Sequence, residues 1–179
     1  MGQALPGFDT PAVGFAQPYE MLQACHERVQ RTLDLLGRLL DHVAQKGHDA
    51  QSRSAAADVL RYFDLAAPLH HEDEERHVFP LLLAQGSAPV RAVVLQLQAE
   101  HEEMGRLWTR IRQPLLRWQE AGATDAADAT LLDLVARFRA LYAGHIPREE
   151  ALAYPAARAA MDMATQARMG AEMQARRRA

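Results

Sequence analysis

Apolar residues recur every three or four positions along most of the chain, a spacing that places them on one face of an α-helix. The first stripe runs from about Pro18 to Gly47 and contains Leu22, Val29, Leu33, Leu36 and Leu40. The second predicts a long helix that Ser52 or Ser54 caps and Gly86 ends. Its apolar positions are Leu60, Phe63, Ala67, Val78 and Leu81.

Two more helices are expected in the second half of the chain. The third runs from about Pro89 to Gly122, and the fourth starts at Thr124 or Asp125 and reaches at least Leu152. No stretch alternates with period two for long enough to predict a strand. Four helices joined by short loops favour antiparallel neighbours, so the sequence predicts an all-α, up-down-up-down four-helix bundle.

The two ends of the chain differ from this pattern. Residues 1–18 are rich in proline and glycine, which predicts an irregular N-terminal arm. The bundle is expected over residues 19–156, and the alanine- and methionine-rich residues 157–179 predict an extra C-terminal helix. Pro68 and Pro147 fall inside predicted helices, where each marks either a kink or a helix end.

Composition narrows the class of protein. A chain of 179 residues with 49% apolar and 24% charged side chains predicts one folded domain. The net charge of −3 gives no positive field for a nucleic acid. Cys25 is the single cysteine, no secretory leader is recognisable, and the longest apolar run, residues 78–84, is too short to cross a membrane. We therefore expect a cytoplasmic protein without nucleic-acid or membrane partners.

The chain repeats itself with a shift of 75 residues. This shift superimposes residues 22–27 on residues 97–102, with one difference. It also matches histidines and glutamates: His26 with His101, His70 with His145, and Glu74 with Glu149. A repeat kept only for packing would match best at its apolar positions, so polar agreement indicates one site built by two helical hairpins.

These six residues have the chemistry of a metal site. His26, His101 and His145 fall within apolar stripes, where an unpaired polar group costs about 1–3 kcal/mol. Histidine and glutamate four residues apart share one face of a helix, as in the pairs at 70 and 74 and at 145 and 149. Imidazole and carboxylate ligands suit iron, manganese or zinc, whereas six donors exceed the needs of one tetrahedral zinc.

The donors are better divided between two ions. We expect His26 and His70 to serve one ion, His101 and His145 to serve the other, and Glu74 and Glu149 to bridge them. Each ion would keep open positions for an oxo or hydroxo bridge and a small ligand. His71 and Glu75 are also four residues apart and form an alternative pair, although the repeat favours His70 and Glu74.

These motifs resemble the hemerythrin-like, HHE cation-binding domains. The segment His70-His71-Glu72-Asp73-Glu74-Glu75, followed by Phe79-Pro80, is similar to their second helix. The segment His145-Ile146-Pro147-Arg148-Glu149-Glu150, followed by Tyr154-Pro155, is similar to their fourth. The resemblance covers roughly residues 19–156 and implies a four-helix bundle with a non-haem di-iron centre bridged by the two glutamates.

The resemblance has one informative departure. Oxygen-carrying hemerythrins add a fifth histidine at the place of Gly105, so this chain is closer to relatives linked to nitric oxide and oxygen responses, iron handling or repair of iron centres. Dioxygen, nitric oxide and peroxide are the small ligands implied. An oxidase- or peroxidase-type enzyme, a repair protein and a sensory module remain alternatives, and the oligomeric state is open, with a dimer as one option.

Residues around the predicted ligands have two readings each. Glu27, Glu102 and Glu150 either orient ligands or are simply solvated, and solvation is favoured for the first two. The aromatic residues that precede the ligand histidines fit either a wall of the metal pocket or the ordinary core; they are Phe63, Phe138 and Tyr142.

Overall fold

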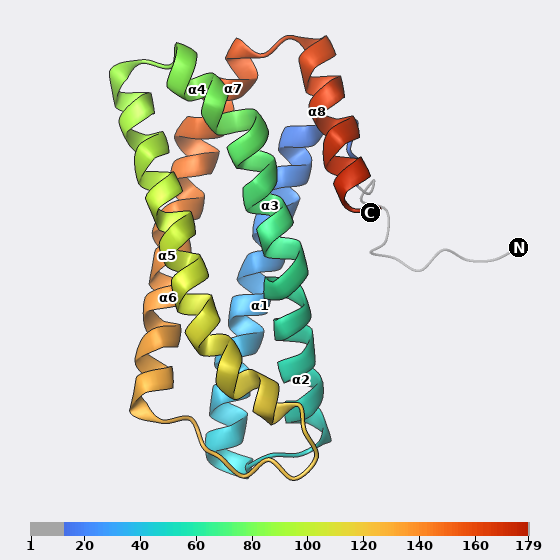
Figure 1. Ribbon diagram of the computed structural model, residues 1–179, viewed down its shortest axis with the longest axis vertical. Helices are drawn as coiled ribbons and strands as arrows, with labels where there is room; N and C mark the ends of the chain where they lie inside the picture. The colour runs from blue at the N-terminus through green and yellow to red at the C-terminus, as the bar shows by residue number, and fades with distance from the viewer. Residues whose placement is uncertain (1–12, 179) are drawn as a thin grey trace, which may run out of the picture.

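The computed structural model describes residues 13–178, and these residues contain helices and no strand. The all-helical class is therefore confirmed for this part of the chain. Four long helical rods lie side by side, and a shorter helix packs against one end of them (Figure 1). Most of the expected arm lies outside the described residues. No helix within 13–178 is both long and apolar enough to span a membrane.

The rods are formed by successive helical segments. The first rod is α1 (Pro18–Lys46) and the third is α5 (Ala88–Trp118). The second consists of α2 (Ala50–Arg61), η1 (Tyr62–Ala66), α3 (Ala67–Asp73), η2 (Glu74–Val78) and α4 (Phe79–Gln85). The fourth consists of α6 (Ala129–Arg148), η3 (Glu149–Ala153) and α7 (Tyr154–Ala160), and α8 (Met163–Arg176) follows it.

Helix ends follow capping chemistry that the sequence only partly indicated. Gly47, at φ 76°, ends α1 as expected. The second rod begins earlier than predicted because Asp49 caps it and forms a capping box with Ser52. The fourth rod begins later than predicted, because the cap is Asp128, whose carboxylate accepts the Leu131 N–H.

Each η segment is a π-turn that ends just before a proline. The N–H groups of Ala67, Phe79 and Tyr154 bond to carbonyls five residues earlier, and the next residue is proline in each case. A proline ring clashes with the carbonyl four residues before it, and the wider turn relieves that clash. Pro68 and Pro147 therefore do not end their helical rods: Pro68 follows a π-turn, and Pro147 lies inside α6.

The core has two apolar clusters separated by a polar layer. Leu22 and Leu97 belong to one cluster, whereas Val29 and Met104 belong to the other. His26 and His101 lie between these pairs in the sequence, so the interruption of the apolar stripe by histidine becomes a buried layer across the bundle.

The C-terminal segment continues the fourth rod before it turns. Residue 156, where the bundle was expected to end, lies inside α7, and Asp162 then caps α8. Met169 and Met173 of α8 are buried in the same apolar cluster as Leu22. The extra helix therefore covers one end of the core and packs against α1 (Figure 1).

Candidate metal centre

All six residues predicted as metal ligands meet in the polar layer. His26 comes from α1, His101 from α5 and His145 from α6. His70 lies in α3, and the two glutamates are the first residues of η2 and η3. Each of the six is buried, with exposed fractions between 0% and 6%. The structure thus collects four imidazoles and two carboxylates from all four rods.

The donor atoms form two groups that share Glu149. His26, His70, Glu74 and Glu149 offer atoms within 4.8 Å of one another, and so do His101, His145 and Glu149. Oε2 of Glu149 lies 3.1 Å from Nε2 of His26, whereas its Oε1 lies 2.8 Å from Nε2 of His145. One carboxylate thus presents a separate oxygen to each group.

Glu74, from the second rod, belongs to the first group and also approaches a histidine of the second group. Its Oε1 lies 3.5 Å from Nε2 of His70, and its Oε2 lies 3.5 Å from Nε2 of His101. The Nε2 atoms of His101 and His145 are 3.1 Å apart. Each glutamate therefore lies near one histidine of the His26 and His70 pair and near one histidine of the His101 and His145 pair.

Carboxylates outside the cluster orient three of the rings. Nδ1 of His26 hydrogen-bonds to Glu150 at 2.8 Å, and Nδ1 of His101 hydrogen-bonds to Glu75 at 2.9 Å. These two glutamates are 75 positions apart, like the histidines that they hold. A carboxylate at Nδ1 turns Nε2 inward and makes it a stronger metal ligand.

The other histidine pair breaks the symmetry. Nδ1 of His145 hydrogen-bonds to Glu100 at 2.8 Å, and Arg148 in turn donates to Glu100. The residue 75 positions before Glu100 is Cys25, and the buried Nδ1 of His70 has no hydrogen-bond partner among residues 13–178. The two halves of the layer are therefore not equivalent.

The three glutamates that were expected either to orient ligands or to be solvated fall into two classes. Glu27 and Glu102 are exposed, as favoured for them, whereas Glu150 orients His26. Sequence reasoning missed the orienting roles of Glu75 and Glu100. The signal for Glu75 was present in the repeat, because this residue matches Glu150.

The alternative pair lies outside the cluster. Glu75 is exposed and bonds to the outer nitrogen of His101, and His71 stacks on the His101 ring with their centroids 3.9 Å apart. His71 and Glu75 belong to neither group of metal-ligating atoms, whereas His70 and Glu74 do.

Burial and close carboxylates shift the ionisation of the cluster. Burial alone would lower the pKa values of His26 and His101. Glu149 and Glu150 instead raise the pKa of His26, and Glu149 and Glu75 raise the pKa of His101. Burial, followed by the neighbouring His26, lowers the pKa of His70 well below its ordinary value.

The pKa values of the two buried glutamates shift in opposite directions. Burial and the adjacent Glu149 raise the pKa of Glu74 well above its ordinary value. Burial alone would raise the pKa of Glu149, but the imidazoles of His101, His145 and His26 hold it well below its ordinary value. Of these two neighbouring carboxyl groups, Glu149 is therefore the more acidic.

A cation fits these donors. Within the part of the chain that the structure describes, buried side-chain atoms without a hydrogen bond include Nδ1 of His70, Oε2 of Glu74 and both carboxylate oxygens of Glu149. A buried carboxylate without partners is costly, whereas a metal ion compensates it directly. The donor set of four imidazoles and two carboxylates is typical of iron, manganese or zinc.

An aromatic residue follows each buried glutamate of the cluster by five positions. Tyr154 stacks on His26, and its hydroxyl lies 3.1 Å from Nε2 of His26 and donates to Glu74. Phe79 stacks on His101 in the corresponding place and has no hydroxyl. The π-turns place both rings on the faces that carry the glutamates.

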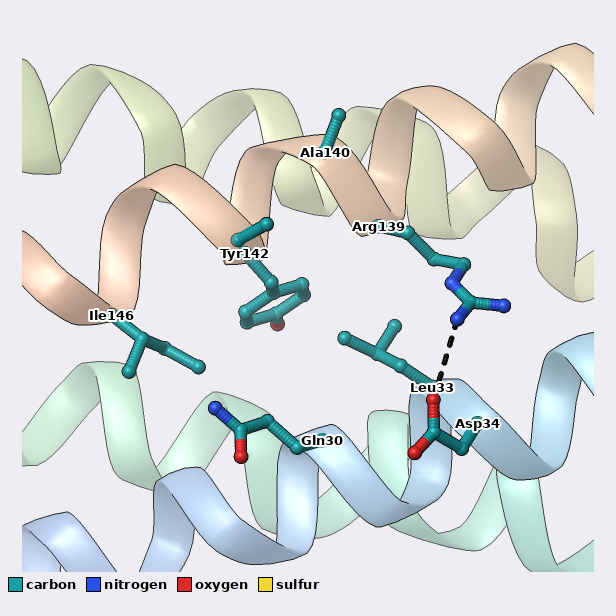
Figure 2. Close-up of a pocket in the computed structure, with 8 residues that line it drawn as sticks. Gln30, Leu33, Asp34, Arg139, Ala140, Tyr142 and Ile146 are labelled. Carbon is teal, nitrogen blue, oxygen red and sulfur yellow. Dashed lines mark hydrogen bonds and ion pairs between the residues drawn. The ribbon is translucent and has the colours of Figure 1, made fainter.

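The groove drawn in Figure 2 is a separate feature. It lies between α1 and α6, has a volume of about 480 Å³, and includes Gln30, Leu33 and Tyr142 in its lining. Its charged groups, Arg139 and Asp34, pair with each other at 3.3 Å. None of the six clustered residues lines it, so we place the chemistry in the buried layer.

Comparison with known proteins agrees with this site. The family model of the hemerythrin HHE cation binding domain matches residues 17–157. An uncharacterized protein of Haemophilus influenzae is 32% identical over 161 residues, which cover 90% of each chain. The matched range includes every residue of the polar layer. The chain therefore belongs to the hemerythrin HHE cation-binding family.

Proposed function

We propose that this protein is a non-haem di-iron protein that binds or responds to small ligands such as dioxygen or nitric oxide, or that handles iron. One observation carries the proposal: Glu74 and Glu149 each present separate oxygens to two pairs of buried imidazoles. The proposal includes an up-down-up-down order of the rods, which the connections at alternating ends in Figure 1 support.

The chain's own residues have defined roles in this proposal. His26 and His70 would hold one iron, His101 and His145 would hold the other, and the two glutamates would be shared. A bound iron pair supplies Lewis acidity and one-electron redox chemistry. The apolar clusters on both sides of the layer exclude water from it.

Hydrogen bonds from outside the cluster prepare the donors. Glu150, Glu75 and Glu100 fix three imidazole rings with Nε2 inward. The Tyr154 hydroxyl donates a hydrogen bond to Glu74 and so holds that side chain in place. These contacts exist within the protein itself and reduce the reorganisation that metal binding requires.

Metal analysis combined with visible spectroscopy of aerobically purified protein tests the proposal. We expect about two irons per chain and an absorption spectrum that azide perturbs. Manganese or zinc in place of iron would be identified in the same measurement and would overturn the di-iron assignment.

A variant pair links the metal to the layer. Glu149 belongs to both groups of donor atoms, so Glu149→Gln should lose most of the bound iron. His42→Ala is the matched control, because His42 pairs with Asp49 and lies outside both groups. Trace iron in wild-type protein from iron-rich medium, or full iron in Glu149→Gln, would contradict the proposal.

A further inference from the structure

A cavity of about 180 Å³ lies beside the polar layer, on the His101 side. Phe63, Trp108, Phe138 and Tyr142 contribute to its wall, and His101 also lines it. These walls come from η1, α5 and α6. The cavity therefore extends to a residue of the cluster, unlike the groove of Figure 2.

Gly105 gives this cavity its opening. It lines the cavity and is exposed, whereas His101, one helical turn away, is buried. A Cβ atom added at Gly105 would meet no other atom within 4 Å. The absence of a side chain at this position thus leaves the surface side of the cavity uncovered there.

The lining selects small and weakly polar occupants. Apolar cavities of about 150 Å³ in proteins stay dry and bind benzene or xenon. The aromatic walls here favour the same kind of molecule over a hydrated ion. His71 also lines the cavity. Its ring is therefore a polar contact that an occupant can use.

A tyrosine hydroxyl lies on the opposite side of the layer, next to His26. The hydroxyl of Tyr154 lies next to Nε2 of His26 and donates to Glu74. The equivalent ring near His101 is Phe79, which carries no hydroxyl. The two halves, although related by the repeat, differ in the space that they leave beside the imidazoles.

We propose that the aromatic cavity behind Gly105 is the entry and holding site for a small uncharged diatomic ligand, and that this ligand approaches the layer on the His101 and His145 side. Tyr154 closes the His26 side. The inference rests on the proposed function, because it assigns the route of the ligand that the metal centre engages.

Xenon tests the cavity without relying on the metal. Crystals of the purified protein pressurised with xenon should show a xenon atom in contact with Phe63 and Trp108. The variant Gly105→Leu, whose longer side chain covers the opening, should lose that atom. Arg110→Leu adds the same side chain at an exposed position of α5 that does not line the cavity, and should keep it.

Nitric oxide tests the route. In reduced, iron-loaded protein, the association rate constant measured by stopped flow should fall at least about tenfold in Gly105→Leu and stay within about twofold in Arg110→Leu. Iron content is measured first for each variant. An iron-free protein would refute the proposed function, while the xenon experiment would still decide whether the cavity accepts an apolar guest.

Three results would overturn the inference. They are wild-type crystals without xenon at this place, a Gly105→Leu variant that associates with nitric oxide at the wild-type rate, and a rate that changes in Tyr154→Phe but not in Gly105→Leu. The last result would place the route on the His26 side.

Discussion

The ring of each clustered histidine has an inner nitrogen that faces the layer and an outer nitrogen whose surroundings differ from ring to ring. Glu150, Glu75 and Glu100 each form a hydrogen bond with the outer nitrogen of one ring. The outer nitrogen of the fourth ring, His70, has no hydrogen-bond partner within residues 13–178. Because such outer contacts fix both the ring orientation and its basicity, they are expected to control metal affinity.

Glu75→Gln should therefore weaken metal binding by about 10–100-fold, since Nδ1 of His101 loses its charged partner. Competitive titration with a chelator measures this change. Glu102→Gln is the control, because Glu102 lies on the same rod as His101 but is exposed. Equal affinities for the two variants would show that the outer contact does not matter.

Metal binding should also depend on pH. The pKa values of His26, His101 and Glu74 are raised. At a given pH, these groups are therefore protonated to a greater extent in the metal-free protein than the same side chains would be in water. Metal ions must displace these protons, so affinity should rise as pH increases through the range of about 6 to 8.

Proton release provides the measurement. Adding Fe²⁺ anaerobically to weakly buffered metal-free protein should acidify the solution, and less so at higher pH. Binding without proton release, with an affinity that does not vary over that range, would contradict the assignment of the protonated groups.

The six clustered residues were predictable from the sequence because the 75-residue repeat marked them as pairs. The orienting residues were harder to predict. Glu100 and Glu102 are both charged residues next to His101, and only the rotation of α5 against α6 decides that Glu100 reaches His145 while Glu102 faces solvent. Contacts between rods depend on packing geometry, which one sequence does not state.

At the scale of the helical elements, π-turns set the register of the second and fourth rods. Glu74 and Phe79 are separated by five residues, one π-turn, and both are buried. In an α-helix, five residues correspond to a rotation well past one turn. The sequence predicted long helices through these segments but not the π-turns, because periodicity changes little when one residue is added.

Deleting Arg76 should remove the η2 turn and rotate α4 by about 100° relative to Glu74. Phe79 and Leu82, both buried, would then leave the core, and the free energy of unfolding would fall by roughly 3–5 kcal/mol. The protein would also lose bound iron. Urea denaturation and metal analysis measure the two effects.

The substitution Arg76→Ala distinguishes the effect of a changed helix register from the effect of losing the Arg76 side chain. Arg76 is exposed and pairs with Glu72 on the surface, so this variant should change stability by no more than about 0.5 kcal/mol. A deletion variant as stable and as iron-rich as Arg76→Ala would show that the π-turn has no role in the register.

At the scale of the whole molecule, α8 is fastened beside the layer by ionic contacts. Asp73, fully buried and adjacent to Glu74, accepts hydrogen bonds from Arg176 at 2.5 Å and from Arg177 at 2.6 Å. The sequence predicted the extra helix but not its docking site, because three arginines at a chain end look solvated without their partner.

Asp73→Ala should lower the free energy of unfolding by about 1.5–3 kcal/mol, because two charged donors lose their acceptor. Thermal or urea unfolding measures this loss. Arg178→Ala, at an exposed neighbouring position, should change stability by no more than about 0.5 kcal/mol. Equal stability of the two variants would mean that α8 is held by its methionines alone.

The docking of α8 also brings the two described ends of the chain together. The Arg177 guanidinium lies 5.2 Å from the centroid of the Phe15 ring, and Gly170 packs against the Phe15 carbonyl. A short linker between these ends, with the chain opened in the connection 119–128, would yield a circular permutant that exchanges the order of the two hairpins. Such a permutant should still assemble the same polar layer. The packing of the two hairpins would then not depend on which of them comes first in the chain.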